Sequence, residues 1–357
     1  MDLTVGLIGC GKFASLHLDG LVRNQHVRRV IAADPEEDAL ERTHRRYGII
    51  TRTETDWRAV VEDESVDVVD IITPHDTHRE IAVAALEAGK HVICEKPIAR
   101  TLDEADAMLA AAEAAEGRLL ISLPQVHFPA IAAAKQLVES GEIGRAFLAV
   151  FSIYDDEFER MSDPEHWKGS LERAGGGVLI DAGYHPLYVL LHMFGRPCSV
   201  TASCRSLLID VEGKGEDTAA VALDFGGRDR VGMMANLTVT FADHGERYRA
   251  DRRVLCEEGV LLIRDMPEDE IPLALMRGED FSPLRVHNPL YVPPYAMEAT
   301  IHDLIGALVE DREPVGTAQL AYDTLRVVRA AYESDREGRR VALEWAEADQ
   351  SSIASPS

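Results

Sequence analysis

The chain has 357 residues, enough for about two domains, each with a hydrophobic core of its own. Its 62 acidic and 37 basic residues give a formal charge of -25, which opposes binding to nucleic acids or anionic membrane surfaces. Five cysteines without C-x-x-C spacing predict free thiols in a reducing compartment. There is no signal-peptide pattern and no apolar run of membrane-spanning length, so we expect a cytoplasmic protein that binds a small molecule.

A strand-like run over residues 4–8 leads directly into a glycine-rich turn and then a helical pattern. The turn reads G-x-G-x-x-A. In a dinucleotide-binding βαβ unit the first glycine makes the tight turn, the second lets the backbone approach the pyrophosphate, and the third small residue lets helix and strand pack closely. The phosphates then lie at the helix N-terminus. The turn residues that we expect to bind a dinucleotide are Gly9, Gly11, Lys12, Phe13 and Ala14.

The second strand-like run ends in Asp34, 23 residues beyond Gly11. That spacing is close to the one expected for a carboxylate that binds the adenosine ribose hydroxyls. A carboxylate repels a 2′-phosphate, so Asp34, followed by Pro35 rather than an arginine, favours NAD over NADP. Alternatively, or in addition, Asp34 caps the helix predicted to follow it.

Strands and helices continue to alternate up to residue 124. Buried strands are predicted over 66–74, 91–97 and 118–124, with helices over 78–89 and 101–117 between them. This alternation predicts right-handed crossovers and a doubly wound parallel sheet, in which ligands bind beyond the carboxyl ends of the strands. The residues at such ends are Thr73, Pro74, His75, Glu95, Lys96 and Pro97.

Lys96 stands out because only six of the basic residues are lysines. For a lone lysine the default interpretation is a polar surface loop. Its position at the end of a predicted strand, next to the expected cofactor crevice, favours a functional role instead.

The second half of the sequence predicts a different sheet. Strand patterns occupy 145–154, 198–208, 217–225, 230–241, 252–258 and 259–265. No long helix separates the last four, which indicates antiparallel neighbours. We therefore predict a Rossmann domain over 1–122 and an α+β domain with a large, mainly antiparallel open sheet over 123–345. The polar tail 346–357 is expected to be disordered.

A run of three glycines, 175–177, precedes a helical pattern that carries Asp181 and His185. The glycines indicate a close approach to another backbone or a ligand. The i, i+4 spacing places both polar side chains on one helix face. A structural pair is the alternative, and a zinc site with His166 as third ligand is another. We predict no metal, because nicotinamide chemistry does not require one.

These motifs together resemble the glucose-fructose oxidoreductase and inositol dehydrogenase family, Gfo/Idh/MocA. The matching stretches are GLIGCGKFA, TPHDTH, GKHVICEKP, GGGVLIDAGYH and IHDLIGALVEDREPV. The resemblance implies a Rossmann domain followed by a domain whose open sheet often mediates dimers or tetramers. It also implies hydride transfer between a nicotinamide cofactor and a secondary alcohol or ketone of a sugar or cyclic polyol.

The resemblance implies roles for individual residues as well. Lys96 would contact the reacting oxygen, with Asp181 and His185 completing the catalytic group, and the Lys96–Pro97 bond would be cis. The expected cofactor contacts beyond the glycine turn are Asp34, Thr73, Pro74, His78, Glu95 and Lys96. For His78 a polar residue at a helix start is the alternative.

The segment expected to contact the substrate departs from the family pattern. Many members carry an N-x-R-F-like segment where this chain reads PQVHFPA, with His127 near the place of the arginine. Substrate contacts are expected from His127, Tyr154 and Lys168, with a solvated loop position as the alternative for the last two.

The sequence therefore predicts an NAD-dependent dehydrogenase acting on a sugar, inositol or related polyol, as a homodimer or homotetramer. His185 would move the hydroxyl proton, Asp181 would hold its imidazole, and Lys96 would stabilise the oxyanion. One alternative is a redox-neutral enzyme with tightly bound NAD that acts on a glycoside. Another is a non-catalytic NAD-binding regulator.

Overall fold

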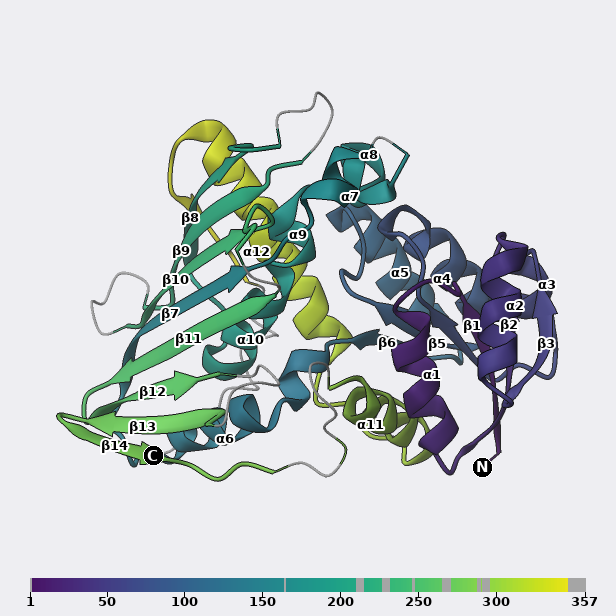
Figure 1. Ribbon diagram of the computed structural model, residues 1–357, viewed down its shortest axis with the longest axis horizontal. Coiled ribbons are helices and arrows are strands. Elements are labelled where there is room, and N and C mark those ends of the chain that lie inside the picture. Colours follow the sequence, from purple (N-terminus) through teal and green to yellow (C-terminus); the bar gives the residue numbers. More distant parts are fainter. Residues whose placement is uncertain are drawn as a thin grey trace. The chain divides into compact units, whose positions relative to one another are not determined.

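The computed structural model describes residues 2–163, 165–209, 215–226, 232–245, 248–264, 271–287, 290 and 296–345 (Figure 1). The chain packs as two compact units. Unit 1 comprises Met1–Pro129, Glu172–Gly175 and His287–Tyr322, and unit 2 comprises Ala130–Leu171, Gly176–Val286 and Asp323–Ser357. The boundaries predicted at 122/123 and 345/346 stay a prediction, and the tail 346–357 lies outside the described residues.

Unit 1 contains a parallel sheet whose six described strands have the order β3-β2-β1-β4-β5-β6. The strands are β1 Leu3–Ile8, β2 Val27–Ala33, β3 Ile50–Glu54, β4 Val68–Ile71, β5 His91–Glu95 and β6 Leu119–Ser122. This is the doubly wound order of a Rossmann fold, which reverses between β1 and β4. The predicted fold class is confirmed. The sequence analysis missed β3, whose polar side chains are partly exposed.

Helices cover both faces of this sheet (Figure 1). They are α1 Ala14–Arg23, α2 Glu37–Arg46, α3 Arg58–Val61, α4 His78–Glu87, α5 Leu102–Ala114 and α11 Met297–Val309. The short helix α8 Leu171–Ala174 also belongs to this unit, except for its first residue. Because the strand order reverses at β1, right-handed crossovers place α1 and α4 on opposite faces. α1 packs against α11, and α4 packs against α5.

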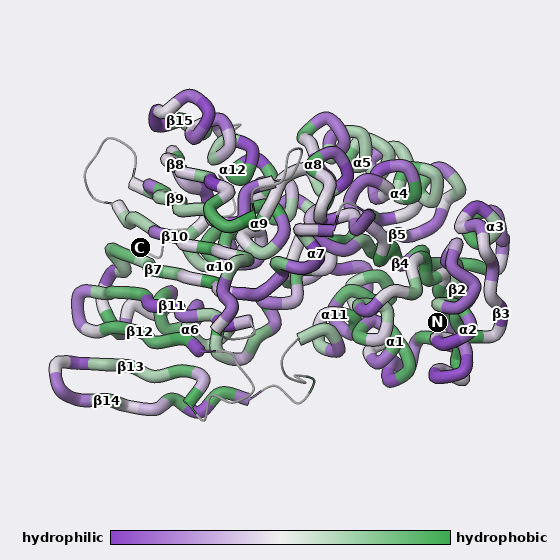
Figure 2. Tube along the Cα trace, turned by 45° about the horizontal axis from the view of Figure 1, so that its top comes forward, coloured by the Kyte–Doolittle hydropathy of each residue, from purple (hydrophilic) through white to green (hydrophobic). Residues whose placement is uncertain are grey.

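Gly20 lets α1 and α11 approach closely, since a Cβ at that position would lie 2.9 Å from Cβ of Ile301. The core of this layer joins apolar residues of α1, β1, β2 and α11. Figure 2 shows α2 as largely hydrophilic, and only Ala39 and Leu40 of that helix are buried. α11 thus contributes Met297, Ile301, Leu304 and Ile305 to the core of unit 1.

Unit 2 contains a sheet whose nine described strands have the order β14-β13-β12-β11-β7-β10-β9-β8-β15. The strands are β7 Ala146–Tyr154, β8 Ser199–Arg205, β9 Thr218–Asp224, β10 Met234–Thr240, β11 Arg249–Cys256, β12 Gly259–Ile263, β13 Leu273–Arg277, β14 Asp280–Pro283 and β15 Val341–Ala342. All pairs are antiparallel except β7 with β10, so the prediction of a mainly antiparallel sheet is confirmed. The six strands predicted in this half are all present, and β13, β14 and β15 were missed.

The helices wholly or mostly in unit 2 are α6 Pro129–Ser140, α7 Phe158–Ser162, α9 Val178–Asp181, α10 Tyr184–Phe194 and α12 Ala318–Glu337. α10 packs on β7 and β10, and α9 packs on β9 and β10. The residues of β9 and β10 alternate between buried and more exposed, as expected for strands with one covered face. In the part of the chain that the structure describes, no helix has both the length and the apolarity to cross a bilayer.

Replacing Gly6 with alanine is expected to lower the free energy of unfolding by about 1–3 kcal/mol, because the new Cβ overpacks the sheet. That Cβ would lie 2.3 Å from Cγ1 of Val60, on α3. Chemical denaturation measures the change. Val60→Ala removes the colliding methyl group, so the double variant should lose less stability than the sum of the two single losses. Additive losses would contradict this packing.

Candidate active site

The glycine turn between β1 and α1 has the shape that a dinucleotide requires. Gly9 has a φ of 100°, and a Cβ there would lie 2.4 Å from the carbonyl oxygen of Ile72. A Cβ on Gly11 would meet nothing within 4 Å, so backbone and ligand can approach closely at this point. Ala14, the first residue of α1, is buried, and the first turn of the helix contains no acidic residue. The turn therefore fits a pyrophosphate at the helix N-terminus.

Asp34 lies at the carboxyl end of β2, beside this turn. Its Oδ2 accepts a hydrogen bond of 2.6 Å from the backbone N–H of Cys10, and its Oδ1 accepts one of 2.9 Å from Glu36. The carboxylate thus fixes the glycine turn and the start of α2 at the same time. Asp34 is not the cap of α2, since the N-cap is Glu36 and no side chain caps that helix, and its role as a ribose ligand stays a prediction.

His78 joins the loops that follow β4 and β5. Its Nδ1 lies 3.0 Å from the carbonyl oxygen of Pro97, and its Nε2 lies 3.0 Å from that of Thr73. Burial lowers the pKa of His78, more than these carbonyl oxygens raise it. The side chain is fully buried and contacts both segments expected to border the nicotinamide, although a neutral imidazole donates to only one of the two carbonyl oxygens. The Lys96–Pro97 bond is cis, as predicted.

His17 was missed by the sequence analysis. It lies on α1 and is fully buried. Its Nδ1 is 2.9 Å from Oδ2 of Asp70 on β4, and its Nε2 is 3.0 Å from Oε1 of Glu95 on β5. Burial opposes the charged imidazole, but the two carboxylates outweigh it and raise the pKa of His17 to about 10. Glu95, predicted as a cofactor contact, directs one carboxylate oxygen to His17 and the other to the backbone N–H of Lys96, at 3.1 Å.

The last two glycines of the run lie in unit 2, where Gly177 packs against backbone and Gly176 against a side chain. A Cβ on Gly177 would lie 2.0 Å from the carbonyl oxygen of Glu216, and one on Gly176 would lie 2.2 Å from the hydroxyl of Tyr332. The Glu216 carboxylate accepts hydrogen bonds from the N–H groups of Gly177 and Leu179, at 3.0 and 2.9 Å. Burial raises the pKa of Glu216, although these bonds lower it in part. Glu216 therefore fixes the N-terminus of α9, the short helix that ends at Asp181.

Asp181 and His185 do not share one continuous helix, which corrects the predicted i, i+4 arrangement. Asp181 ends α9, and α10 begins at Tyr184 after Gly183. The Oδ2 of Asp181 lies 2.7 Å from Nζ of Lys168, and Nδ1 of His185 lies 3.0 Å from the hydroxyl of Tyr188. The predicted hydrogen bond between Asp181 and the His185 imidazole stays a prediction.

Lys168 is largely buried among acidic and aromatic side chains. Besides Asp181, its Nζ lies 3.5 Å from a carboxylate oxygen of Glu157. The ring centres of Trp167 and Phe241 lie 5.7 and 5.1 Å away, close enough for cation–π attraction. Burial opposes its charge, but Asp181 and Glu157 raise the pKa of Lys168 overall. Its ammonium group is thus engaged within unit 2, where it holds the Asp181 carboxylate.

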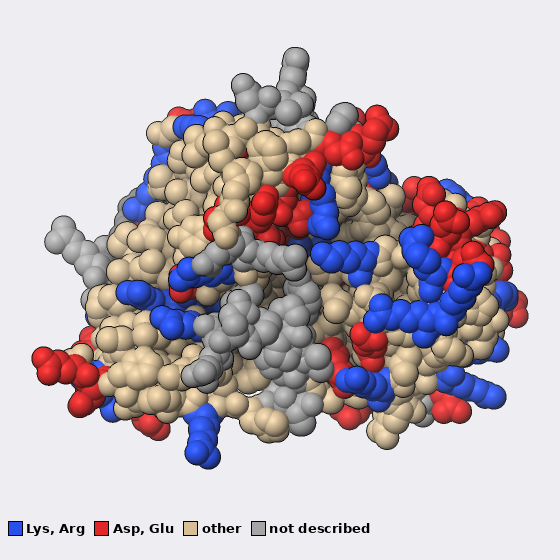
Figure 3. Space-filling view, in the orientation of Figure 1, with Lys and Arg blue, Asp and Glu red and all other residues tan. Residues whose placement is uncertain are grey.

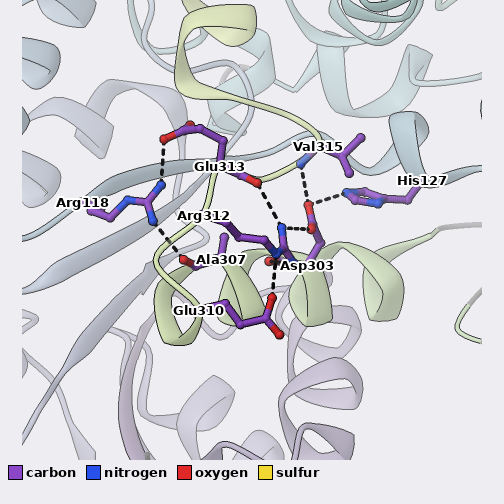
Figure 4. Close-up of polar contacts among 8 residues, drawn as sticks. All are labelled: Arg118, His127, Asp303, Ala307, Glu310, Arg312, Glu313 and Val315. Atoms are coloured by element: carbon purple, nitrogen blue, oxygen red, sulfur yellow. Dashed lines mark hydrogen bonds and ion pairs between the residues drawn. The ribbon is translucent and has the colours of Figure 1, made fainter.

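The two other predicted substrate contacts lie in different settings. Tyr154 is the last residue of β7 and is half-buried. In unit 1, Nε2 of His127 lies 3.6 Å from Oδ2 of Asp303 on α11 (Figure 4). Burial lowers the pKa of His127, against the attraction of this carboxylate. Figure 4 also shows Asp303 accepting hydrogen bonds of 2.8 Å from Arg312 and from the N–H of Val315.

Within the described residues, no group of three or more His, Cys, Asp and Glu side chains is arranged to hold a metal ion. All five cysteines belong to this described set and are free thiols.

Acidic and basic side chains are intermixed over the end of unit 1 that carries α2 and α3 (Figure 3). Ion pairs such as Arg45–Glu41 and Arg58–Glu80 account for part of that mixing.

Two family models match the chain. Residues 3–122 match the model described as "Oxidoreductase family, NAD-binding Rossmann fold", and residues 131–262 match the "GFO/IDH/MocA C-terminal domain". The chain belongs to the Gfo/Idh/MocA family of oxidoreductases. The predicted family and NAD as cofactor are confirmed.

Its relatives include several named dehydrogenases. Levoglucosan dehydrogenase of Pseudarthrobacter phenanthrenivorans is 36% identical over 210 residues, which cover 56% of this chain and 53%, about half, of that protein. D-apiose dehydrogenase of Paraburkholderia graminis is 28% identical over 98% of this chain and 92% of its own. A solved structure of levoglucosan dehydrogenase in complex with NADH and levoglucosan superposes with a TM-score of 0.85 at 25% identity, covering 96% of this chain and 99% of its own.

His17 and His78 are both fully buried in unit 1, and we expect them to carry opposite charge states. Since the folded pKa of His17 is raised to about 10, its stabilising contribution is full below about pH 6.5 and is lost as the pH rises toward 10. The pKa of His78 is lowered, so its contribution is present above about pH 6.5 and is lost as the pH falls. Nitrogen-15 NMR of the imidazoles, assigned with His17→Gln and His78→Gln, should show a charged His17 and a neutral His78 at pH 8. A neutral His17 there would contradict the prediction.

Replacing Asp303 with asparagine should lower the free energy of unfolding by about 1.5–3 kcal/mol, because hydrogen bonds to a charged group are lost. The side chain of Asp303 is 11% exposed and has three partners in Figure 4. The matched control is Glu310→Gln, which removes the other carboxylate on Arg312. Glu310 is 64% exposed, so its loss should cost at most about 1 kcal/mol. Equal losses in the two variants, measured by chemical denaturation, would contradict this prediction. They would show that burial does not decide how much each carboxylate contributes to the free energy of unfolding.

Proposed function

We propose that the protein is an NAD-dependent dehydrogenase that acts on a secondary alcohol or ketone of a sugar, inositol or related polyol. The observation that carries the proposal is the pairing of a dinucleotide turn after β1 with a lysine directly after β5. In the sheet order both strands flank β4, so the two loops lie at the same carboxyl edge. This is the edge at which an open α/β sheet binds its ligand.

In the proposed reaction each side chain has one task. Bound NAD would supply the hydride acceptor for the alcohol carbon. His185 takes the hydroxyl proton, because histidine is the common side chain whose unperturbed pKa of about 6.5 lies near working pH. Lys96 stabilises the developing oxyanion by its charge. Asp181 holds the His185 imidazole and favours its protonated form.

The substrate class is supported by the relatives, which include dehydrogenases named for levoglucosan, D-apiose and inositol. We further propose His127 and Tyr154 as substrate contacts, a homodimer or homotetramer as the assembly, and the cytoplasm as the location. Free thiols at all five cysteines support a reducing compartment.

A panel of sugars, anhydrosugars and inositols, each with NAD and with NADP, tests the proposal through absorbance at 340 nm. We expect reduction of NAD by at least one compound, with a lower kcat/KM for NADP because of Asp34. Lys96→Ala should lower kcat by about 100-fold or more, as removal of an oxyanion-stabilising group does. NAD that co-purifies with the protein and turns over glycosides without net NADH would favour the redox-neutral alternative. Binding of NADH without turnover of any compound would favour a regulator.

The pH profile of kcat/KM should lose the limb that reports deprotonation of the general base when His185 is replaced by alanine. His185→Ala should also lower kcat by about 100- to 10,000-fold. Tyr188→Phe is the matched control, since it removes the hydroxyl that contacts Nδ1 of His185 and leaves the imidazole. If His185→Ala kept the wild-type profile and rate, proton transfer would belong to Lys96 or Asp181.

A further inference from the structure

A buried set of three ionisable side chains in unit 1 has no catalytic role in the function proposed above, although one of them, Glu95, is an expected cofactor contact. His17 lies on α1, Asp70 on β4, and Glu95 at the end of β5. The imidazole nitrogens face the two carboxylates at 2.9 to 3.1 Å. His17 and Asp70 are fully buried, and the side chain of Glu95 is 11% exposed. The set is a charged unit inside the core of the NAD-binding fold.

Net stability is a weak explanation for such a set. Removing two or three charges from water costs several kcal/mol for each ion, and replacing a buried ion pair by apolar residues is often neutral or stabilising. A buried ionic group fixes geometry instead, since each of its members has only one arrangement that satisfies the others. The question is which geometry this set fixes.

The contacts lead from the cofactor turn to Lys96. α1 begins at the glycine turn, and His17 is the fourth residue of that helix. Its Nε2 holds Oε1 of Glu95, which leaves Oε2 directed at the backbone N–H of Lys96, at 3.1 Å. Two hydrogen bonds therefore join the helix at the phosphate site to the backbone of the lysine.

The charge of this set also strengthens the hydrogen bond between Glu95 and the backbone of Lys96. Burial raises the pKa of Glu95, but the hydrogen bond and charge of His17, with a further contribution from Lys96, lower it overall. An ionised Glu95 is a stronger acceptor for the Lys96 N–H than a protonated one. Without His17 the buried carboxylate would lose its main counter-charge and would take up a proton or turn away.

We propose that His17 is a positioning residue of the active site, which holds the Glu95 carboxylate ionised and oriented so that Glu95 fixes the backbone of Lys96. Through it, the helix that receives the cofactor phosphates and the lysine that acts on the substrate are coupled. The inference rests on the proposed roles of Lys96 and the glycine turn. The part of it that concerns structure can be tested without any substrate.

The first experiment measures amide hydrogen exchange of Lys96 by NMR in protein labelled with nitrogen-15 lysine, which gives six backbone signals at most. His17→Gln should speed exchange at Lys96 by about tenfold or more, because a hydrogen bond worth about 1.5 kcal/mol is lost. Asp70→Asn keeps the link between His17 and Glu95 and should change this exchange much less. Tyr47→Phe is the matched control, because Tyr47, the residue after α2, bonds through its hydroxyl to the helix that carries His17. It removes hydrogen bonds to Ser15 and Asp19, far in sequence from Lys96, and should leave the exchange unchanged.

The second experiment measures NADH affinity by fluorescence and kcat with the substrate found in the panel. His17→Gln should lower kcat by about 10- to 100-fold, the usual effect of a small misplacement of a catalytic group, with NADH affinity nearly unchanged. The double variant His17→Gln/Glu95→Gln should be no slower than the slower single variant, because both changes break one link.

The two experiments separate failure of the inference from failure of the proposed function. Exchange at Lys96 and kcat in His17→Gln that match those in Tyr47→Phe would show His17 to be only structural and would overturn the inference. Wild-type protein that binds no NADH would overturn the proposed function. Faster exchange at Lys96 in His17→Gln would still support the coupling in that case.

Discussion

The strand order of the parallel sheet in unit 1 is the constraint on which the candidate site depends. The neighbours β2, β1, β4 and β5 all run in one direction, so the segments after their carboxyl ends meet at one edge. These strands are close enough that a Cβ on Gly9, after β1, would collide with the carbonyl oxygen of Ile72, after β4. The first glycine is therefore required by the sheet as much as by the cofactor.

Both units contain a charged side chain that is largely removed from water and lies next to the proposed catalytic group. In unit 1 the imidazole of His17 lies between two carboxylates, and in unit 2 the ammonium of Lys168 lies 2.7 Å from Asp181 and 3.5 Å from Glu157. Such pairs contribute little net stability, because desolvation offsets most of their attraction. Each of them nevertheless contacts a residue of the proposed catalytic group or its immediate neighbour in the chain.

The sequence was sufficient to predict features that are encoded in short stretches of the chain. The strand before Gly9, the strand end at Asp34 and the lysine after β5 could be read from short patterns, because alternation of strands and helices determines which ends share an edge. His17 could not be found in this way. Its partners Asp70 and Glu95 lie 53 and 78 residues further along the chain, and only the folded sheet brings them together. A single histidine on a helix gives no sign of such partners.

The interruption between α9 and α10 escaped the sequence for a different reason. The apolar periodicity continues through Gly183, so the pattern predicts one helix although the backbone forms two. The glycine run had left open whether backbone or ligand approaches it. At Gly177 the neighbour is backbone, because the carbonyl oxygen of Glu216 lies 2.0 Å from a Cβ at that position. Because the Glu216 carboxylate also binds two N–H groups at the start of α9, the position of Asp181 is set from both ends of that helix. Glu216 fixes its first turn, and Lys168 fixes the carboxylate at its last residue.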